Sequence, residues 1–313
     1  MAIAFTFPGQ GSQQIGMGKE LAEAFPQARA VFEEIDEALG QSLSKLMWQG
    51  EEAELTLTAN AQPALMAVSM AVMKVLEAKG VDLAKTVKFV AGHSLGEYSA
   101  LAAAGAISIS DTARLLRIRG DAMQKAVPVG EGAMAALLGL DFDDAAEVAA
   151  AAAQGQVCQA ANDNAPGQVV VSGAREAVER AIELAQGKGA RRAMLLPVSA
   201  PFHCALMAPA AEAMRAALAT TRINAPAVPL VANVVAAPIS DPGEIRSRLV
   251  EQVTGTVRWR ESVAAMAGVG VTRLYELGAG KVLTGLAKRI DRSLEGQAIG
   301  APGDIEAVIG DLT

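Results

Sequence analysis

Ser94 lies in a sequence context that could make its hydroxyl a nucleophile. Residues 92–96 read Gly-His-Ser-Leu-Gly, a G-x-S-x-G pattern between an apolar run typical of a β-strand (87–91) and a run typical of a helix (97–104). In such an elbow the chain turns so sharply that side chains at the two glycine positions would collide with neighbouring backbone. The backbone N–H of Leu95 is then free to face a developing oxyanion. The alternative is a tight turn whose serine only caps the helix.

A serine nucleophile needs a base, and the chain contains two histidines. His93 is part of the elbow pattern itself. His203 lies where the chain is expected to pass between two domains, which makes it the candidate base, with a structural histidine as the alternative. The neighbouring Cys204 is assigned to packing, because adjacent residues rarely direct their side chains at each other. The 110 residues after His203, and the lack of an aspartate in the expected order, weigh against an ordinary α/β-hydrolase lipase or esterase.

A second loop with glycines, residues 8–13, follows the first predicted strand (3–7). Its sequence Pro-Gly-Gln-Gly-Ser-Gln allows close approach of the backbone to a ligand, and Gln10 can present its N–H between the two glycines. It is not a dinucleotide-binding fingerprint, because Gln14 stands where the third glycine is required. Composition alone favours an ordinary connection between a strand and a helix.

Composition argues against several classes of protein. The formal net charge of −7, without a tail rich in Lys or Arg, disfavours a general nucleic-acid binder. The two cysteines form neither a disulfide framework nor a metal-binding pattern, which fits a reducing, cytoplasmic compartment. The N-terminus lacks the basic region of a signal peptide. The uncharged run 55–73 is interrupted by Pro63, so it predicts a buried helix over about 64–79 and no membrane span.

The order of the predicted elements indicates an α/β protein of two domains. The large domain, residues 1–128 and 199–313, is predicted to be hydrolase-like with a parallel central sheet, its strands at 3–7, 87–91, 228–231 and, as the last, 271–277. Helices are predicted at 28–39, at 209–218, at 244–253 and from Ser110-Asp111 onward, the last carrying Arg114, Arg117 and Arg119.

The middle of the chain, residues 129–198, is predicted to be a small inserted domain. Strand-like and helical runs alternate there as β-α-β-β-α-β, the order of a ferredoxin-like α+β unit. Its second and third strands, 156–161 and 168–172, are predicted to be joined by a turn rich in Asn162, Asp163 and Asn164.

Five motifs together resemble those of the bacterial malonyl-CoA:acyl carrier protein transacylases, relatives of polyketide synthase acyltransferase domains. They follow one another in the family's order along essentially the whole chain: residues 8–13, residues 92–98, the region of Arg119, Pro201-Phe202-His203, and residues 275–281. The resemblance implies roles for eight positions: Ser94 as nucleophile, His203 as base, the backbone N–H groups of Gln10 and Leu95 as oxyanion hole, Arg119 as partner of the malonyl carboxylate, the main-chain carbonyl of Gln252 in place of a triad acid, and His93 and Phe202 as pocket walls, Phe202 in the malonyl-selective pattern.

The resemblance also implies a reaction and its partners. Malonyl-CoA would acylate the serine, and the phosphopantetheine thiol of an acyl carrier protein would take the malonyl group in a ping-pong scheme that supplies fatty-acid synthesis. No metal or redox cofactor is expected, the enzyme would be a cytoplasmic monomer, and nucleic acid and membrane are not expected partners. A basic lip of Lys188, Arg191 and Arg192 would meet the acidic carrier, unless it is an ordinary solvated edge. The competing functions are a serine hydrolase that passes the acyl group to water and a non-catalytic carrier-binding module.

Overall fold

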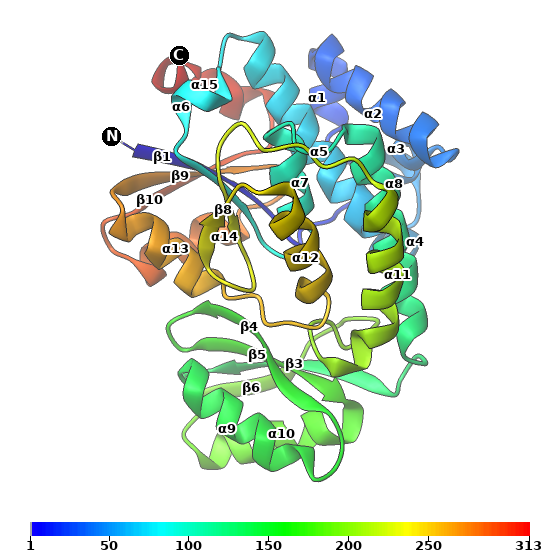
Figure 1. Cartoon of the computed structure of the whole chain (residues 1–313), viewed down its shortest axis with the longest axis vertical. Helices are drawn as coiled ribbons and strands as arrows, with labels where there is room; N and C mark the ends of the chain where they lie inside the picture. Colours follow the sequence, from blue (N-terminus) through cyan, green and yellow to red (C-terminus); the bar gives the residue numbers. More distant parts are fainter. Residues whose placement is uncertain (1) are drawn as a thin grey trace.

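Two β-sheets organise the protein, which a computed structural model describes over residues 2–313. The larger sheet lies in the upper part of Figure 1 and has the order β10-β9-β1-β2-β7-β8. All neighbours in it run parallel except β7 and β8. Its strands are β1 (Ala2–Phe7), β2 (Phe89–Gly92), β7 (Leu230–Ala232), β8 (Ala237–Ile239), β9 (Val271–Leu277) and β10 (Glu295–Ile299). The prediction of a parallel central sheet is therefore confirmed.

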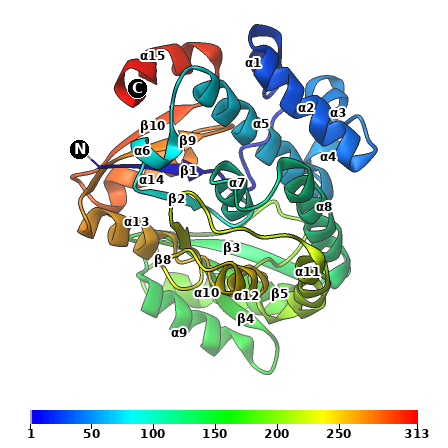
Figure 2. The ribbon, with the colours of Figure 1, turned by 45° about the horizontal axis from the view of Figure 1, so that its top comes forward.

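Helices cover both faces of the large sheet (Figures 1 and 2). Alternation along β1 divides the core. Ile3, Phe5 and Phe7 pack with α5 (Thr58–Ala78), α7 (Gly96–Ala103) and α8 (Ile109–Ala126), whereas Ala4 packs with α13 (Trp259–Gly268) and α14 (Val282–Ile290) on the other face. The helices of this part are α1 (Lys19–Ala24), α2 (Pro26–Leu39), α3 (Leu43–Gln49), α4 (Glu52–Thr56), α5 (Thr58–Ala78), α6 (Leu83–Thr86), α7 (Gly96–Ala103), α8 (Ile109–Ala126), α11 (Ala208–Thr220), α12 (Pro242–Gln252), α13 (Trp259–Gly268), α14 (Val282–Ile290) and α15 (Pro302–Leu312), with a short 3-10 turn at Ala205–Met207.

Three features of this part differ most from the sequence predictions, whereas the other predicted helices and strands have bounds within two residues of those observed. Helix α5 begins at Thr58 rather than near 64, with Pro63 inside it, because a proline removes only one ladder hydrogen bond and close packing on α8 stabilises the first turns. The N-cap of α8 is Ser108, whose side chain accepts from the backbone N–H of Asp111. The strand predicted as the last is followed by the half-exposed edge strand β10, which has no continuous apolar pattern.

Helix α5 is also long and apolar enough to cross a membrane by length and composition. In the fold, however, 89% of its most apolar stretch is buried inside the protein. It packs against α2, α7 and α8. Its apolar character therefore serves the core, as the sequence predicted.

The smaller sheet, at the bottom of Figure 1, is antiparallel with the order β4-β5-β3-β6. Its strands and helices are β3 (Gly132–Leu138), α9 (Phe142–Ala153), β4 (Cys158–Ala165), β5 (Gln168–Ala174), α10 (Arg175–Gly187) and β6 (Arg192–Leu195). This order is that of the predicted ferredoxin-like unit. One face, with Ala135 and Leu137, packs on α9 and α10, while Met134 and Val170 on the other face join the core of the large sheet. The exact domain limits, 128/129 and 198/199, stay a prediction.

The turn predicted at Asn162, Asp163 and Asn164 is wrong, because all three residues belong to β4. Asn162 pairs with Val170 of β5. On the other edge, the N–H of Asp163 donates to the Val257 carbonyl at 2.9 Å, and a bridge joins Asn162 to Val257. Neighbours distant in sequence thus supply the strand hydrogen bonds that the turn-forming tendency of Asn and Asp would otherwise oppose.

Candidate active site

Ser94 lies at the tip of a sharp turn between β2 and α7 and has a left-handed backbone with φ of 53°. A Cβ on Gly92 would lie 1.9 Å from the carbonyl carbon of Gly96, and one on Gly96 would lie 2.2 Å from the carbonyl oxygen of Phe7. The expected collisions at the two glycines are therefore confirmed. The close approach of Gly92 to Gly96, and of Gly96 to Phe7, fixes the turn, so that the serine hydroxyl projects from the carboxyl edge of the sheet.

The Ser94 hydroxyl lies against an imidazole held from behind by a carbonyl. Ser94 Oγ is 2.7 Å from His203 Nε2, and His203 Nδ1 is 2.9 Å from the carbonyl oxygen of Gln252. A carbonyl only accepts, so Nδ1 carries the proton and Nε2 is free to accept one from the serine. Burial and the nearby Arg119 charge lower the pKa of His203 to about 3, which keeps the imidazole neutral. His203 also has a left-handed backbone, with φ of 58°.

Arg119, on α8, is 1% exposed and reaches the same hydroxyl. Its Nη2 donates to Ser94 Oγ at 3.0 Å and to Gln252 Oε1 at 2.8 Å, and its Nη1 donates to Gln62 Oε1 at 2.9 Å. Its buried Nε finds no acceptor within residues 2–313. A guanidinium stays charged in proteins, so the site keeps a buried cation beside the serine, with donors to spare.

A hydrogen-bonded layer supports the elbow from below. Asn233 Oδ1 accepts from the Ser94 N–H at 2.8 Å, and Asn233 Nδ2 donates to the Gly92 carbonyl at 2.7 Å. Gln252 Nε2 donates to Glu97 Oε2 at 2.7 Å and to the Ser94 carbonyl at 2.9 Å. Burial raises the pKa of Glu97 to about 7. These bonds fix the backbone of Ser94 and the side-chain amide of Gln252, whose Oε1 accepts from Arg119.

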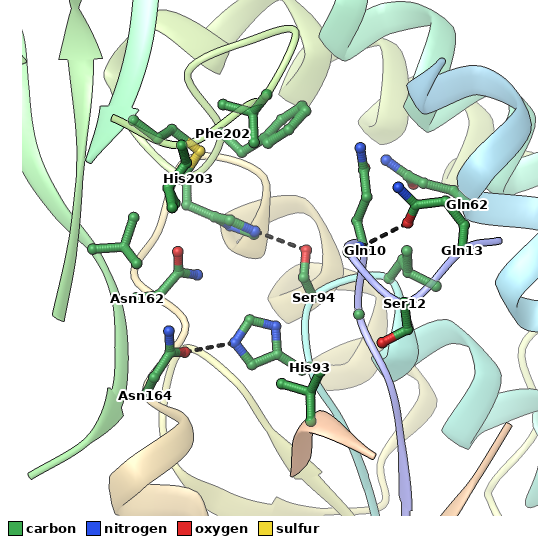
Figure 3. A pocket seen from close by; sticks show the side chains of 18 of the residues that line it. Gln10, Ser12, Gln13, Gln62, His93, Ser94, Asn162, Asn164, Phe202 and His203 are labelled. Atoms are coloured by element: carbon green, nitrogen blue, oxygen red, sulfur yellow. Dashed lines mark hydrogen bonds between the residues drawn. The ribbon is translucent and has the colours of Figure 1, made fainter. Parts of the chain in front are cut away.

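A cavity of about 550 Å³ opens above the serine, between the two sheets. Gln10 and Leu95 line it, and their backbone N–H groups donate to no acceptor in the described part of the chain. His93 and Phe202 line it as well. In Figure 3 the side chains of Ser94 and His203 point toward each other, with asparagines of β4 on one side and glutamines of the first loop and α5 on the other.

Comparison with known proteins identifies the family. The acyl transferase domain pattern matches residues 4–288. The chain belongs to the acyl transferase family. It is 48% identical to the malonyl CoA-acyl carrier protein transacylase of Bacillus subtilis over 311 residues, which is 99% of this chain and 97% of that protein.

Solved structures of acyl transferases are similar to this protein over nearly its whole length, and two of them illustrate the likeness. The acyl-carrier-protein-S-malonyltransferase of Bartonella henselae has a TM-score of 0.98 and 60% identity, over 100% of this chain and 99% of that one. A malonyl-transacylase in complex with its type II PKS acyl-carrier protein has a TM-score of 0.96 and 43% identity, over 99% of this chain and 100% of that one. These likenesses also confirm the predicted fold class.

The acyl transferase structure brings together all eight residues singled out in the sequence. Of the predicted basic lip, only Lys188 already has acidic partners, and the docking role of Arg191 and Arg192 stays a prediction. Lys188 pairs with Asp144 at 3.0 Å and with Glu147, so its charge is already matched. Arg191 directly precedes β6 and Arg192 begins it; Arg192 pairs with Leu138 of β3, whose other partner is the cavity-lining Gln168. The Cys204 thiol is buried and donates to the Pro201 carbonyl at 3.2 Å, away from His203, as expected for packing.

Sequence reasoning missed three polar residues of this acyl transferase site: Gln62, Glu97 and Asn233. All three are buried, with exposed fractions of at most 1%. The available signal was a polar residue in an otherwise apolar element, such as Gln62 in α5, because a buried polar group needs a partner. Within residues 2–313, no group of three or more His, Cys, Asp or Glu side chains is placed to hold a metal ion.

Proposed function

We propose that the chain transfers the malonyl group of malonyl-CoA to the phosphopantetheine thiol of an acyl carrier protein, through an ester on Ser94. The observation that carries this proposal is the contact of one serine hydroxyl with both a neutral imidazole, at 2.7 Å, and a buried guanidinium, at 3.0 Å. The imidazole can activate the hydroxyl as a base, and the guanidinium can select an acyl group that carries a free carboxylate, as malonyl does. The names of the similar proteins point to the same reaction.

In the first half-reaction, His203 Nε2 takes the proton of Ser94 Oγ while Oγ attacks the thioester carbonyl carbon. The carbonyl oxygen becomes an oxyanion, which the free N–H groups of Leu95 and Gln10 would stabilise. Collapse breaks the C–S bond, and the leaving CoA sulfur takes the proton from the imidazolium. The Gln252 carbonyl, 2.9 Å from Nδ1, keeps the ring oriented throughout.

The second half-reaction is the reverse with a new thiol. The pantetheine thiol of the carrier protein gives its proton to His203 and attacks the ester carbonyl. The C–O bond to Ser94 breaks, and Oγ recovers the proton. During both steps Arg119 would hold the malonyl carboxylate with its guanidinium, whose Nη2 lies 3.0 Å from Ser94 Oγ, while His93 and Phe202 would form the walls.

Incubation of the purified protein with malonyl-CoA tests this function. Rapid formation of a malonyl adduct, followed by transfer to the thiol of a holo carrier protein, is the expected result. Steady release of free malonate would indicate a serine hydrolase instead. Absence of a covalent adduct would indicate a binding module and refute the proposal.

The proposal includes a setting. The reaction would supply malonyl units to fatty-acid synthesis in the cytoplasm, and the enzyme would act as a monomer. The large domain, residues 1–128 and 199–313, would supply the elbow and the base, and the inserted domain, residues 129–198, would close the other side of the cavity. Both sides line it, as Ser94 and Asn162 illustrate.

A further inference from the structure

The reaction makes no direct use of the fifth sequence motif, residues 275–281. In the fold this motif forms the end of β9 and the turn that leads into α14, and the turn lies against the first loop, residues 8–13. A Cβ on Gly280 would lie 2.7 Å from Ser12 Oγ and 2.8 Å from Ser12 Cβ, closer than non-bonded atoms approach. Figure 3 shows Ser12 next to Gln10 on the first loop. The two segments therefore touch at a point that has no room for a side chain.

Contacts of this kind fix the first loop, because its backbone is not held by hydrogen bonds. In the part of the chain that the structure describes, no backbone N–H or carbonyl of residues 9–12 bonds to a residue outside the loop. On one side the loop rests on the elbow, where a Cβ on Gly9 would lie 2.9 Å from the His93 carbonyl oxygen. On the other side it rests on the turn at Gly280. The direction of the free N–H of Gln10 therefore depends on both supports.

A buried carboxylate keeps the second support in shape. Glu276 is 0% exposed and accepts from the Leu283 N–H at 3.2 Å, from the Thr284 N–H at 2.7 Å and from the Thr284 hydroxyl at 2.8 Å. These bonds tie the end of β9 to the first residues of α14 and so close the turn between them. From below, the Ser69 hydroxyl of α5 donates to the Leu277 carbonyl at 2.8 Å. The turn is thus held from two sides and can act as a rigid support.

We propose that Gly280 is a positioning residue for the oxyanion hole, because its missing side chain lets the first loop lie where the Gln10 N–H faces the thioester oxygen. The inference rests on the proposed function and assigns a task to the fifth motif. Every thioester has this oxygen, whatever its acyl group, and the oxyanion exists only during the chemical step. A displaced N–H should therefore slow malonyl and acetyl transfer alike and leave substrate binding unchanged.

The test compares acylation of Gly280→Ala and of the parent by rapid mixing, with release of the CoA thiol as the signal. The added methyl group would push Ser12 and, two residues away, the Gln10 N–H. We expect the maximal rate to fall about tenfold or more, by the same factor for malonyl-CoA and acetyl-CoA. Complete removal of an oxyanion donor costs roughly 100- to 1,000-fold. The half-saturating concentrations should stay within about twofold of those of the parent.

Two variants separate the contact from the backbone conformation. Gly270 and Gly280 have similar left-handed backbones, with φ of 92° and 81°, but a Cβ on Gly270 would meet nothing within 4 Å. Gly270→Ala therefore shares the backbone cost without the contact and should keep the rates of the parent. Ser12→Gly added to Gly280→Ala removes both atoms that the methyl group would meet, and it should restore most of the lost rate. Ser12→Gly alone completes the double-mutant cycle.

Glu276→Gln tests the same support without an added side chain, which covers the case in which Gly280→Ala does not fold. Its amide has nearly the same shape but places an N–H₂ group against a backbone N–H, so the turn should loosen and cause a smaller loss of the same kind. The role of Gly280 is overturned by an unchanged rate, by a loss confined to malonyl-CoA, by a rise only in the half-saturating concentration, or by no recovery in the double variant. A parent protein that forms no malonyl ester would instead refute the proposed function itself.

Discussion

Replacement of Arg119 by alanine should separate malonyl from acetyl transfer. The two acyl groups share the thioester and differ by one carboxylate, so only malonyl can use the buried guanidinium. Each charge-assisted hydrogen bond contributes roughly 1.5–3 kcal/mol, and the variant would leave the carboxylate buried without a cation. We therefore expect the kcat/KM for malonyl-CoA to fall by about 100-fold or more, which corresponds to about 2.7 kcal/mol in the barrier.

Acetyl transfer by the same variant should stay constant or rise. In the parent, Arg119 Nη2 donates to Ser94 Oγ at 3.0 Å, and its charge helps to lower the pKa of His203 to about 3. Loss of this cation frees Ser94 Oγ from one hydrogen bond and raises the pKa of His203, although burial remains the larger cause of the low pKa. The decline of acetyl transfer in acid, where His203 becomes protonated, should then begin at a higher pH than in the parent.

The measurement is kcat/KM for malonyl-CoA and acetyl-CoA in parent and variant, each over a range of pH. Arg117→Ala is the matched control. It lies on the same helix, but its guanidinium donates to Asn60 at 2.8 Å and to Gln41 at 2.6 Å, and it does not line the cavity. If both thioesters lose the same factor in Arg119→Ala, the arginine supports the fold or the CoA site, and the reasoning about the carboxylate is refuted.

Four further results are expected. Ser94→Ala should stay folded and form no malonyl adduct, so an adduct in its intact mass would contradict the nucleophile assignment. His203→Ala should slow acylation at least ~100-fold, and a near-normal burst would move the base elsewhere. Arg191→Glu with Arg192→Glu should raise the KM for the carrier protein and spare acylation by malonyl-CoA; unchanged carrier kinetics would make these arginines a solvated edge. Burial raises the pKa of Glu97 from 4.5 to about 7, so the native state holds a proton that the unfolded chain releases. The free energy of unfolding should therefore fall as pH rises from about 5 to 7. In Glu97→Gln, denaturant unfolding measured over the same pH range should not show this fall.

Local rules of the sequence determined the elbow and the order of elements in the small sheet. Gly92 is required by a close approach to Gly96 within the same turn, so the local pattern predicts the turn; Gly96 is required by the Phe7 carbonyl of β1, which only the fold brings near. The alternating runs between 132 and 195 give the β-α-β-β-α-β order because strand and helix periodicities are properties of short segments. The scarcity of histidines pointed to His203 without any structure.

The tertiary structure alone decided the polar contacts that define the site. Arg119 reaches Gln252 across 133 residues of sequence, and His203 reaches Ser94 across 109, so no local pattern contains either bond. Asn162 is a further example. Its sequence context predicted a turn, but the residue belongs to β4 and pairs with the distant Val257, which places it at the cavity. A short segment determines which backbone conformations are sterically possible. Packing between distant segments determines which buried polar groups meet, because each must find its partner, or its ligand, in the folded protein.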